Sequence, residues 1–591
     1  MALFRRARSL CCGAVFFLSV NCGQISTANA YEPVLLPNVD IFSNYESGRP
    51  AFGVGVFAPL LQNGSSFVFL DGSLSASDTA FNAASIGIGY RIQRSWGVLG
   101  INGFLDLSQP VYSDIQTQIG LGLEVATGRF RLGVNGYLPL DDKETALGAS
   151  EAVIVGNELL IFGGEEHFLK GVELELGILA GQFDTGQFSA QLWTHGKLAS
   201  FYSDELGSQN SAQIGFEAVI KPFSSVLSNS EIRFGAGASW DEDNDFGLTA
   251  SFKMSMALGR RTSASHSDHG AAYDLLSNRV SRRLGVYSKG SATGASELTY
   301  DHDTNVALNT VYQVDNQLDL DAALLNSNSL TIVDGSSTTY TPIKLRGDRT
   351  VMGGGSTILV RGRDTGQVVA FTAAGARPTI KVITNPLTTT TYSRTGADIT
   401  GNNSHIAGFK FVGTGGFTLF FGVGVGIGSN VSNTVIEQNT FDNFPAAITI
   451  SPFGRDHIIR ANHIERSYIG VNLGSSLLNV LIEDNQIGNL DLLFGSKGDA
   501  IHIPSGANVS SAAEPITIQN NYFFGIISGA IIDVSSGGYA LAGSGNSSSA
   551  LNGSGVSAVS AFLCTTNGTA FGGSVGFKGG TVQYLSATQC Y

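Results

Sequence analysis

Apolar and polar residues alternate along much of the chain between residues 47 and 259. The stretch RFRLGVNGYLPL (129–140) shows this pattern with few interruptions. The same alternation recurs in residues 85–92, 118–125, 172–178 and 212–220, and longest in 246–258. A period of two with one apolar face predicts β-strands that bury one side. In the first stretch that side carries Phe130, Leu132, Val134 and Leu138, and the other carries Arg131, Gly133, Asn135 and Tyr137.

Three features favour a membrane barrel over a soluble sandwich, which produces the same alternation. The polar faces consist of Gly, Ser, Thr, Glu, Lys and Arg, as a wet lumen requires. The strands run for about ten residues, the length at which a tilted strand crosses the hydrocarbon layer. Short connections (62–65, 93–96, 127–128) alternate with longer polar ones. With a first strand near residues 44–48, we expect about twelve antiparallel strands, an even number that closes without edges in lipid.

The N-terminus has the pattern of a secretory signal. Three arginines within residues 5–8 precede the apolar run LCCGAVFFLSV, which is too short to span a bilayer as a helix. Residues 28–30 form an A-x-A cleavage motif, so we expect cleavage after Ala30. A lipoprotein signal at Cys22 fits less well, because Asn21 stands where a small residue is required.

Composition narrows the function classes. The net charge of −14 argues against binding to nucleic acid, and a hydrophobic content of 43% argues against global disorder. Three of the five cysteines lie in the signal, which leaves Cys564 and Cys590. In an exported chain two cysteines favour one disulfide; two free thiols are the alternative.

The order of motifs in the first half resembles a known family. VFAPLLQN, SIGIGYRI, GVLGINGFLD, QIGLGLEV and FRLGVNGYLPL follow one another as similar motifs do in the barrel of intimin/invasin-type inverse autotransporters. The segment AAYDLLSNRVSRRLGVY (271–287) is similar to the family's segment after the barrel. The resemblance, over roughly residues 47–290, implies a twelve-stranded outer-membrane barrel, a linker that re-enters the pore, and a C-terminal passenger outside the cell. It also implies outer-membrane lipid, periplasmic chaperones and the barrel-assembly machinery as partners.

Residues 260–290 are predicted to form a short helical linker in the pore. Asp268 lies near the start of this helix and three arginines lie near its end, in agreement with the helix dipole. We hypothesise that the helix plugs the pore, with its arginines beside glutamates of the lumen. A solvated surface helix is the alternative. The hypothesis names Arg279, Arg282 and Arg283 on the linker and Glu124, Glu173, Glu175 and Glu217 on the wall.

A second architecture begins at residue 291. Four segments, TVIEQNTF, HIIRANHI, VLIEDNQI and ITIQNNYF, align on an asparagine, and 405–411 is an earlier copy with Phe409 in its place. Such a repeat predicts a β-solenoid, in which stacked coils share one core. It resembles the right-handed parallel β-helix of pectate-lyase-like proteins. Asparagine suits a turn because it tolerates left-handed backbone and bonds to its own copies, so we predict a structural role for Asn439, Asn462, Asn485 and Asn521, spaced by 23, 23 and 36 residues.

A glycan-active enzyme is the main alternative for this half. The strands AAITI, IGVNL, DAIHI and AIIDV place Thr449, Asn472, His502 and Asp533 in one outward column, with Asp499 close by. Asp499, His502 and Asp533 are therefore weak catalytic candidates, since lyases and hydrolases of this fold need clustered carboxylates. A solvated face shows the same residues. The sequence has no zinc spacing, nucleophile elbow or phosphate loop, so we expect no enzyme activity, no cofactor and no metal.

These observations together predict an all-β chain. The expected parts are a signal peptide (1–30), a short periplasmic segment (31–46), an outer-membrane barrel (47–259), a helical linker (260–290) and a surface-exposed β-helix passenger (291–591). The residues 535–558, rich in Gly, Ser and Asn, are expected to be a flexible loop or a poorly ordered coil. We expect display of the passenger for adhesion or surface recognition of a protein or glycan ligand. A porin-like channel with an unrelated extra domain is a further alternative.

Overall fold

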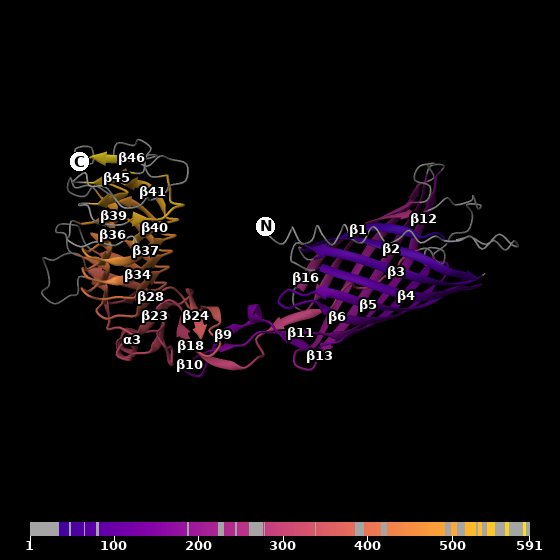
Figure 1. Cartoon of the computed structure of the whole chain (residues 1–591), viewed down its shortest axis with the longest axis horizontal. Helices are drawn as coiled ribbons and strands as arrows, with labels where there is room; N and C mark the ends of the chain where they lie inside the picture. Colours follow the sequence, from indigo (N-terminus) through magenta and orange to yellow (C-terminus); the bar gives the residue numbers. More distant parts are fainter. Residues whose placement is uncertain are drawn as a thin grey trace. The chain divides into compact units, whose positions relative to one another are not determined.

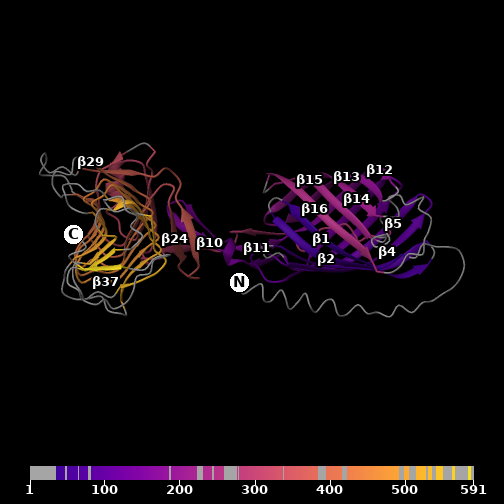
Figure 2. The same ribbon diagram turned by 90° about the horizontal axis from the view of Figure 1, so that it is seen from above.

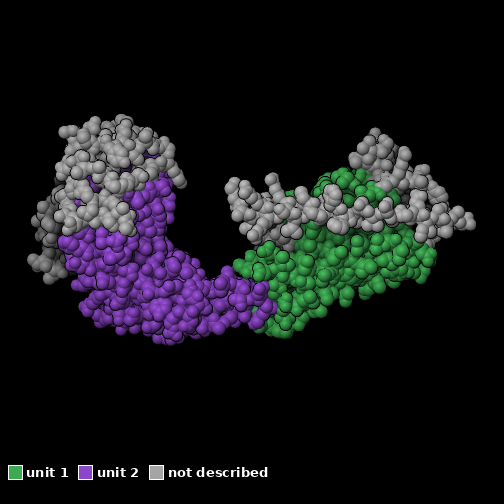
Figure 3. Space-filling model, in the orientation of Figure 1, with its two compact units in different colours: residues 1–142, 167–289 green, residues 143–166, 290–591 purple. Residues whose placement is uncertain are grey.

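The computed structural model describes residues 35–586 of the chain except for several gaps. Those are 47–48, 64, 78–81, 186–187, 223–229, 243–244, 259–275, 277, 337–338, 384–394, 415–421, 491–497, 505–513, 528–529, 535–540, 550–561 and 566–582. The chain divides into two compact units (Figure 3). We call residues 1–142 and 167–289 the barrel unit, and residues 143–166 and 290–591 the coil unit.

The barrel unit is a closed antiparallel barrel of twelve strands, as the sequence predicts (Figures 1 and 2). Closure is made by β1 and β16, whose ends pair as Asn38 with Ala257. The first strand therefore begins at Asn38, upstream of residues 44–48 where the sequence analysis placed it. The strands are β1 (Asn38–Glu46), β2 (Arg49–Asn63), β3 (Ser66–Ser77), β4 (Asn82–Arg94), β5 (Gly97–Gln109), β6 (Gln116–Ala126), β7 (Phe130–Pro139), β12 (Lys170–Asp184), β13 (Phe188–Ser203), β14 (Gly207–Pro222), β15 (Ser230–Asp241) and β16 (Asp245–Ala257).

The apolar faces of these strands point outward. Along β5 burial alternates residue by residue, so Ile101 is 52% exposed whereas its neighbour Asn102 is buried. Leu121 and Leu123 of β6 are likewise exposed, and Glu124 is buried inside. A soluble sandwich would bury its apolar faces. An outer surface of exposed Ile, Leu, Val and Phe around a polar interior is what lipid selects.

The coil unit contains three long sheets in which all pairs are parallel, consistent with a β-helix (Figure 1). The short helix α3 (Gln317–Ala323) contributes Leu320 and Ala323 to their shared core. The first sheet is β19 (Thr310–Val314), β20 (Ser329–Val333), β23 (Arg349–Gly353), β28 (Ser404–Ala407), β31 (Thr434–Glu437), β34 (Arg455–Arg460), β37 (Leu478–Glu483), β40 (Ile516–Gln519) and β43 (Leu541–Ala542). The second is β21 (Thr339–Tyr340), β26 (Thr379–Ile383), β29 (Lys410–Thr414), β32 (Thr440–Asp442), β35 (His463–Glu465), β38 (Gln486–Leu490), β41 (Tyr522–Ile527) and β44 (Ser547–Ser548). The third is β22 (Ile343–Leu345), β27 (Thr395–Ile399), β30 (Val423–Ile427), β33 (Ala446–Ile450), β36 (Ile469–Leu473), β39 (Asp499–Ile503), β42 (Ile532–Val534), β45 (Phe562–Thr565) and β46 (Gln583–Ser586).

The repeated asparagines form a buried ladder between the first and second sheets. Asn485 Oδ1 accepts a hydrogen bond from the backbone N–H of Asn462 at 3.0 Å, and its Nδ2 donates to the carbonyl of Ile459 at 2.8 Å. Asn521 Oδ1 in turn accepts from the N–H of Asn485. Each side chain thus satisfies backbone groups of the neighbouring coil, which the dry interior requires.

Two details of the ladder differ from the expectation. The left-handed residue of each turn is the one before the asparagine, for example Ala461 (φ 54°) and Asp484 (φ 54°), and not the asparagine itself. The ladder also extends to Asn546, whose Oδ1 accepts from the N–H of Asn521. Residues 541–549 therefore form part of a coil, which agrees with the coil alternative for this region and not with the flexible loop. At the other end, the N–H of Phe409 donates to Asn439 Oδ1.

Replacement of Asn485 by Ala is expected to lower the free energy of unfolding of the coil unit by about 2–6 kcal/mol. The change leaves the N–H of Asn462 and the carbonyl of Ile459 without partners in the core, and each such group costs about 1–3 kcal/mol. Pulse proteolysis across a urea series measures this loss of stability. Gln486→Ala, at the exposed neighbouring position, is the control. Equal midpoints for the two variants would contradict a structural ladder.

The connection between β7 and β12 belongs to the coil unit, although it is inserted within the barrel sequence. Its strands β9 (Glu151–Val155) and β10 (Glu158–Phe162) form a hairpin. The hairpin joins a five-stranded antiparallel sheet of order β25–β24–β18–β10–β9, with β18 (Ser296–Asp301), β24 (Thr357–Gly362) and β25 (Val368–Thr372). From the sequence this connection was only a long polar loop. A further three-stranded sheet has the order β17–β11–β8, with β17 (Ser288–Ser291), β11 (Glu165–Phe168) and β8 (Lys143–Thr145).

Candidate functional site

The lumen of the barrel holds the segment that follows β16. Residues 278–287 contain no helical turn, so the helix expected within residues 260–290 does not extend into them, although Leu276 just before them is helical. Residues 259–275 and 277 lie outside the described part of the chain. We call residues 278–287 the pore segment. Its Val280, together with Leu276 just before it, packs with Phe57, Phe69 and Phe104 of the wall.

The wall supplies hydrogen-bond partners for the backbone of the pore segment, which explains why no helix is needed. The N–H of Val280 donates to Asp71 Oδ2 at 2.9 Å, and the N–H of Val286 donates to Ser108 Oγ at 2.8 Å. The carbonyl of Asn278 accepts from Arg91 at 2.7 Å. Asn135, Tyr137 and Gln118 make further bonds of this kind to the backbone of residues 281, 283 and 285. An extended backbone can stay dry because these polar side chains replace the bonds of a helix.

Two arginines of the pore segment bind aspartates of the wall. Arg282 makes a two-pronged pair with Asp106, at 2.7 and 2.6 Å, and both side chains are almost fully buried. Arg279 Nε lies 2.6 Å from Asp71 Oδ1. The third arginine, Arg283, lies over the rings of Phe201 and Tyr287. Planar guanidinium–carboxylate pairs fix orientation as well as charge, so they hold the segment in one register.

The glutamates expected to meet these arginines bind other wall residues instead. Glu124 pairs with Arg91 at 3.0 Å. Glu173 and Glu175 lie 3.4 and 3.6 Å from Lys197, and Glu217 lies 3.0 Å from Arg233. Glu175 also contacts the pore segment, where it accepts a hydrogen bond from Ser281 Oγ. The sequence analysis chose glutamates on the polar faces of the strands. It overlooked Asp71 on the polar face of β3 and Asp106 on the polar face of β5.

The pore segment runs from one rim of the barrel to the other. We call the rim with the turns 64–65, 95–96 and 127–129 the short-turn rim; β16 ends there, paired with the start of β1. The opposite rim carries the connection after β7 and the start of β12. Tyr287, at the end of the pore segment, accepts from the N–H of Leu169 beside β12 and stacks on Phe201 near the end of β13. The chain therefore crosses the lumen and leaves at the rim opposite the end of β16.

Comparison with known families agrees with this geometry. Residues 38–283 match the model of the family described as inverse autotransporter, beta-domain. The barrel is an outer-membrane barrel that is similar to this family over the matched residues. An outer-membrane barrel contacts membrane lipid, the partner that the resemblance implied. No curated protein matches the chain.

The solved barrel structures that are similar to part of this chain share few identical residues with it. The KdgM porin is 8% identical with a TM-score of 0.24, over 38% of this chain and 99% of that one. The beta domain of the Bordetella autotransporter Brka is 8% identical with a TM-score of 0.23, over 38% and 99%. The translocator domain of the autotransporter NalP from Neisseria meningitidis is 11% identical with a TM-score of 0.20, over 43% and 98%. Among the described residues, no helix is long and apolar enough to span a membrane.

In the coil unit, the three catalytic candidates lie together on the third sheet. His502 pairs in register with Asn472 on one side and with Asp533 on the other, so the column of the sequence analysis is present. His502 Nδ1 lies 2.8 Å from Asp533 Oδ2 and 3.8 Å from Asp499 Oδ2. The contact with Asp533 raises the pKa of His502. Asp533 is buried, and its second oxygen, Oδ1, has no hydrogen-bond partner among the residues that the structure describes.

The sequence analysis missed a buried charge network near the first coils. His405 is fully buried, with Nδ1 2.7 Å from Asp301 Oδ2 and Nε2 3.0 Å from Glu437 Oε1. Arg460 binds Glu437 and Asp303. The two carboxylates raise the pKa of His405 to about 10 despite its burial, and His405 holds the pKa values of Asp301 and Glu437 below their usual range. His405, Asp301 and Glu437 are closed to solvent, whereas Arg460 is partly exposed, and we assign the network a structural role.

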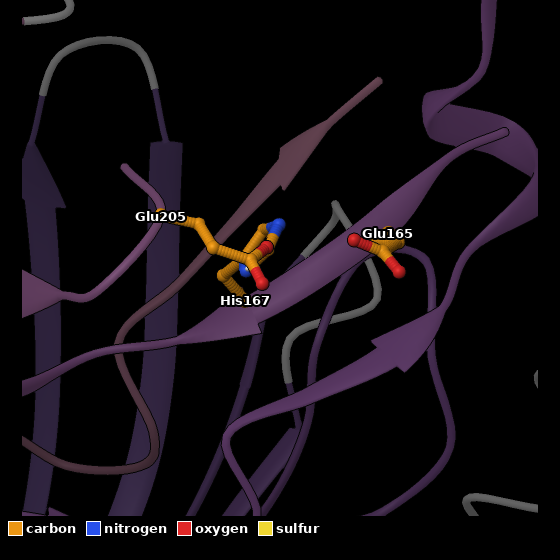
Figure 4. Close-up of side chains that lie close together, drawn as sticks. All are labelled: Glu165, His167 and Glu205. Carbon is orange, nitrogen blue, oxygen red and sulfur yellow. Dashed lines mark ion pairs between the residues drawn. The ribbon is translucent and has the colours of Figure 1, made fainter. Parts of the chain in front are cut away.

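A further group of acidic and imidazole side chains lies around β11 (Figure 4). His167 Nδ1 is 3.4 Å from Glu205 Oε2 within the barrel unit. Glu165 accepts from Lys143 Nζ at 3.0 Å and from Thr293 Oγ1 at 2.8 Å within the coil unit. These partners account for the charges, so we assign no metal ion to the group.

Three predicted features lie outside the described residues. They are the cleavage after Ala30, Cys590, and the side chain of Cys564, although strand β45 itself is described. The register of β42 and β45 places Cys564 next to Asp533 in the ladder. The proposed disulfide stays a prediction.

Proposed function

We propose that the chain is an inverse autotransporter that inserts its barrel in the outer membrane and displays its own C-terminal coil unit on the cell surface. The observation that carries the proposal is the occupied pore. Residues 278–287 bind the wall through backbone bonds and through Arg279 and Arg282, as a segment built to remain in the lumen would.

The direction of the crossing supports display outside the cell. Bacterial barrels carry short turns on the periplasmic side and longer loops outside. The pore segment starts from the short-turn rim and ends at the rim where the connection after β7 emerges. On this orientation the chain after residue 289 leaves toward the outside, together with residues 143–166.

We further propose adhesion or surface recognition as the task of the displayed unit. Stacked coils offer long regular faces, which suit extended ligands of protein or glycan. The ion pairs of His405 with Asp301 and Glu437, closed to solvent, support a rigid coil unit. A surface ligand of either class fits this proposal.

Protease shaving of intact cells tests display. Antibodies against residues 450–520 and against a periplasmic control protein are used before and after treatment. Loss of the 450–520 epitope with survival of the control is expected. An epitope that resists until the outer membrane is broken would place the coil unit in the periplasm and refute the proposal.

A surface glycan lyase or hydrolase is the second candidate function, because Asp499, His502 and Asp533 offer ligand atoms within 4.8 Å of one another. Two carboxylates and an imidazole suit either acid/base work or a divalent cation that does part of it. If the candidate is right, Asp499→Ala and Asp533→Ala each lower cleavage of a responsive glycan at least about 100-fold. Asn472→Ala, in the same column, is the control. Absence of turnover by the unmodified chain on a broad glycan panel would count against an enzyme.

A further inference from the structure

The connection inserted between β7 and β12 completes the core of the coil unit. Leu159 and Ile161 of the hairpin are almost fully buried, and with Ala152 they join a cluster formed otherwise by residues of the C-terminal half. Their partners there include Leu308, Leu330, Met352, Ile358 and Phe371. We call residues 151–162 the anchor hairpin.

Backbone pairing adds to this apolar contact. Strand β10 pairs with β18 through Leu160 with Leu298 and Phe162 with Ser296. Beside the ladder, the N–H of Val311 donates to the carbonyl of Asn157 at 2.7 Å, and Thr299 Oγ1 donates to the carbonyl of Leu159 at 3.0 Å. The N–H of Gly163 donates to the carbonyl of Ala295. The hairpin therefore covers the edge of β18, which would otherwise expose unpaired groups.

We propose that the anchor hairpin keeps the C-terminal part of the chain bound to the barrel after the peptide chain is cut behind the pore. Residues 143–166 are joined covalently to the barrel at both ends, because β7 precedes them in the chain and β12 follows them. A cut after residue 291 removes the covalent link of the C-terminal part but leaves the hairpin in its core and sheet. The C-terminal part thus binds a segment of its own chain, the anchor hairpin. It therefore stays attached to the barrel without an intact linker. On cells the inference rests on the proposed display; in detergent it does not.

The test uses the full chain with a site-specific protease sequence inserted between Ser291 and Ala292. After complete cutting in detergent, shown by two fragments on a denaturing gel, we expect both fragments to elute as one complex in size-exclusion chromatography. They should separate only in denaturant. Elution of fragment 292–591 apart from the barrel overturns the inference.

Two substitutions sharpen the result. Leu159→Asp places a charge in the core and is expected to release at least nine-tenths of the C-terminal fragment after the cut. Val155→Asp in the same hairpin, at a position 48% exposed, is expected to release none. Release from both variants to the same extent contradicts the role of the hairpin core. The cut chain without substitutions decides the question if Leu159→Asp does not fold.

The same inserted chain on intact cells separates the two proposals. Cutting without release into the medium supports both display and retention. Release by the cut refutes retention and supports display. If the protease cuts the purified chain but not the chain on intact cells, display fails and the detergent result alone decides retention.

Discussion

The chain with Arg282→Asp is expected to conduct ions in planar bilayers, whereas the unmodified chain is expected to stay closed. In the variant two carboxylates, at positions 106 and 282, would face each other in a site where both native side chains are almost fully buried. Breaking one buried pair costs about 3–5 kcal/mol. At 1.4 kcal/mol for each factor of ten, the population with an empty lumen rises by roughly two to three and a half powers of ten.

Three controls accompany the conductance measurement. Arg129→Asp, an exposed arginine in a turn of the barrel, is expected to stay closed. The double variant Arg282→Asp with Asp106→Arg restores an opposite pair and is expected to reclose the pore. A chain lacking residues 260–290 gives the open conductance. Steady conductance from the unmodified chain would instead favour the porin alternative and refute a pore filled by its own linker.

Replacement of His405 by Leu is expected to lower the free energy of unfolding of the coil unit by about 3–5 kcal/mol. The change removes the cation between Asp301 and Glu437 and leaves two carboxylates in a site closed to solvent. His463→Leu is the matched control, because its ring is 39% exposed and lies 3.8 Å from Glu465. Such a pair is worth at most about 1 kcal/mol.

Pulse proteolysis of the coil unit in urea measures the free energy of unfolding of both histidine variants. Tryptophan fluorescence does not report on this unit, because all three tryptophans (Trp96, Trp193 and Trp240) lie in the barrel sequence. Tryptophan fluorescence then reports separately that the barrel is unchanged. Equal losses from His405→Leu and His463→Leu would show that the buried network contributes nothing specific.

The same network predicts how stability depends on pH. The pKa of His405 is raised from 6.5 to about 10, so between these values the folded chain holds a proton that the unfolded chain lacks. Its contribution is complete below pH 6.5, decreases as pH rises, and is lost as pH passes 10, with a slope of up to about 1.4 kcal/mol per pH unit. The pKa values of Asp301 and Glu437 are lowered, so their contribution is present above the ordinary carboxyl value and is lost in acid. The alkaline slope should be absent from His405→Leu.

Much of the barrel could be predicted from residues that lie close in sequence. The side on which Leu121 and Leu123 project follows from the period of a strand, and the structure has both exposed. The spacing of Asn439, Asn462 and Asn485 predicted stacked coils, and the structure stacks them. The period of two is a property of the local backbone, and a repeat is visible wherever one coil copies another, so both are readable without a structure.

The structure alone decided which distant residues meet. Arg279 binds Asp71, 208 positions away, and not the glutamates that the polar faces suggested. The helix expected in the linker is absent from residues 278–287, because wall side chains take its hydrogen bonds. These contacts depend on how many strands are paired and in which register, and a pattern of a few neighbouring residues does not predict that register.

The sequence by itself determined the alternating strands of the barrel, the polarity of their faces and the repeat of the coils, because these follow from backbone geometry over a few residues. Only the tertiary structure decided the partners of the charges and the place of the anchor hairpin. The hairpin pairs with a strand that begins 134 residues after its own end, from Phe162 to Ser296. Contacts at that separation are selected by the free energy of the whole fold, in which each buried charge and each strand edge must find a partner.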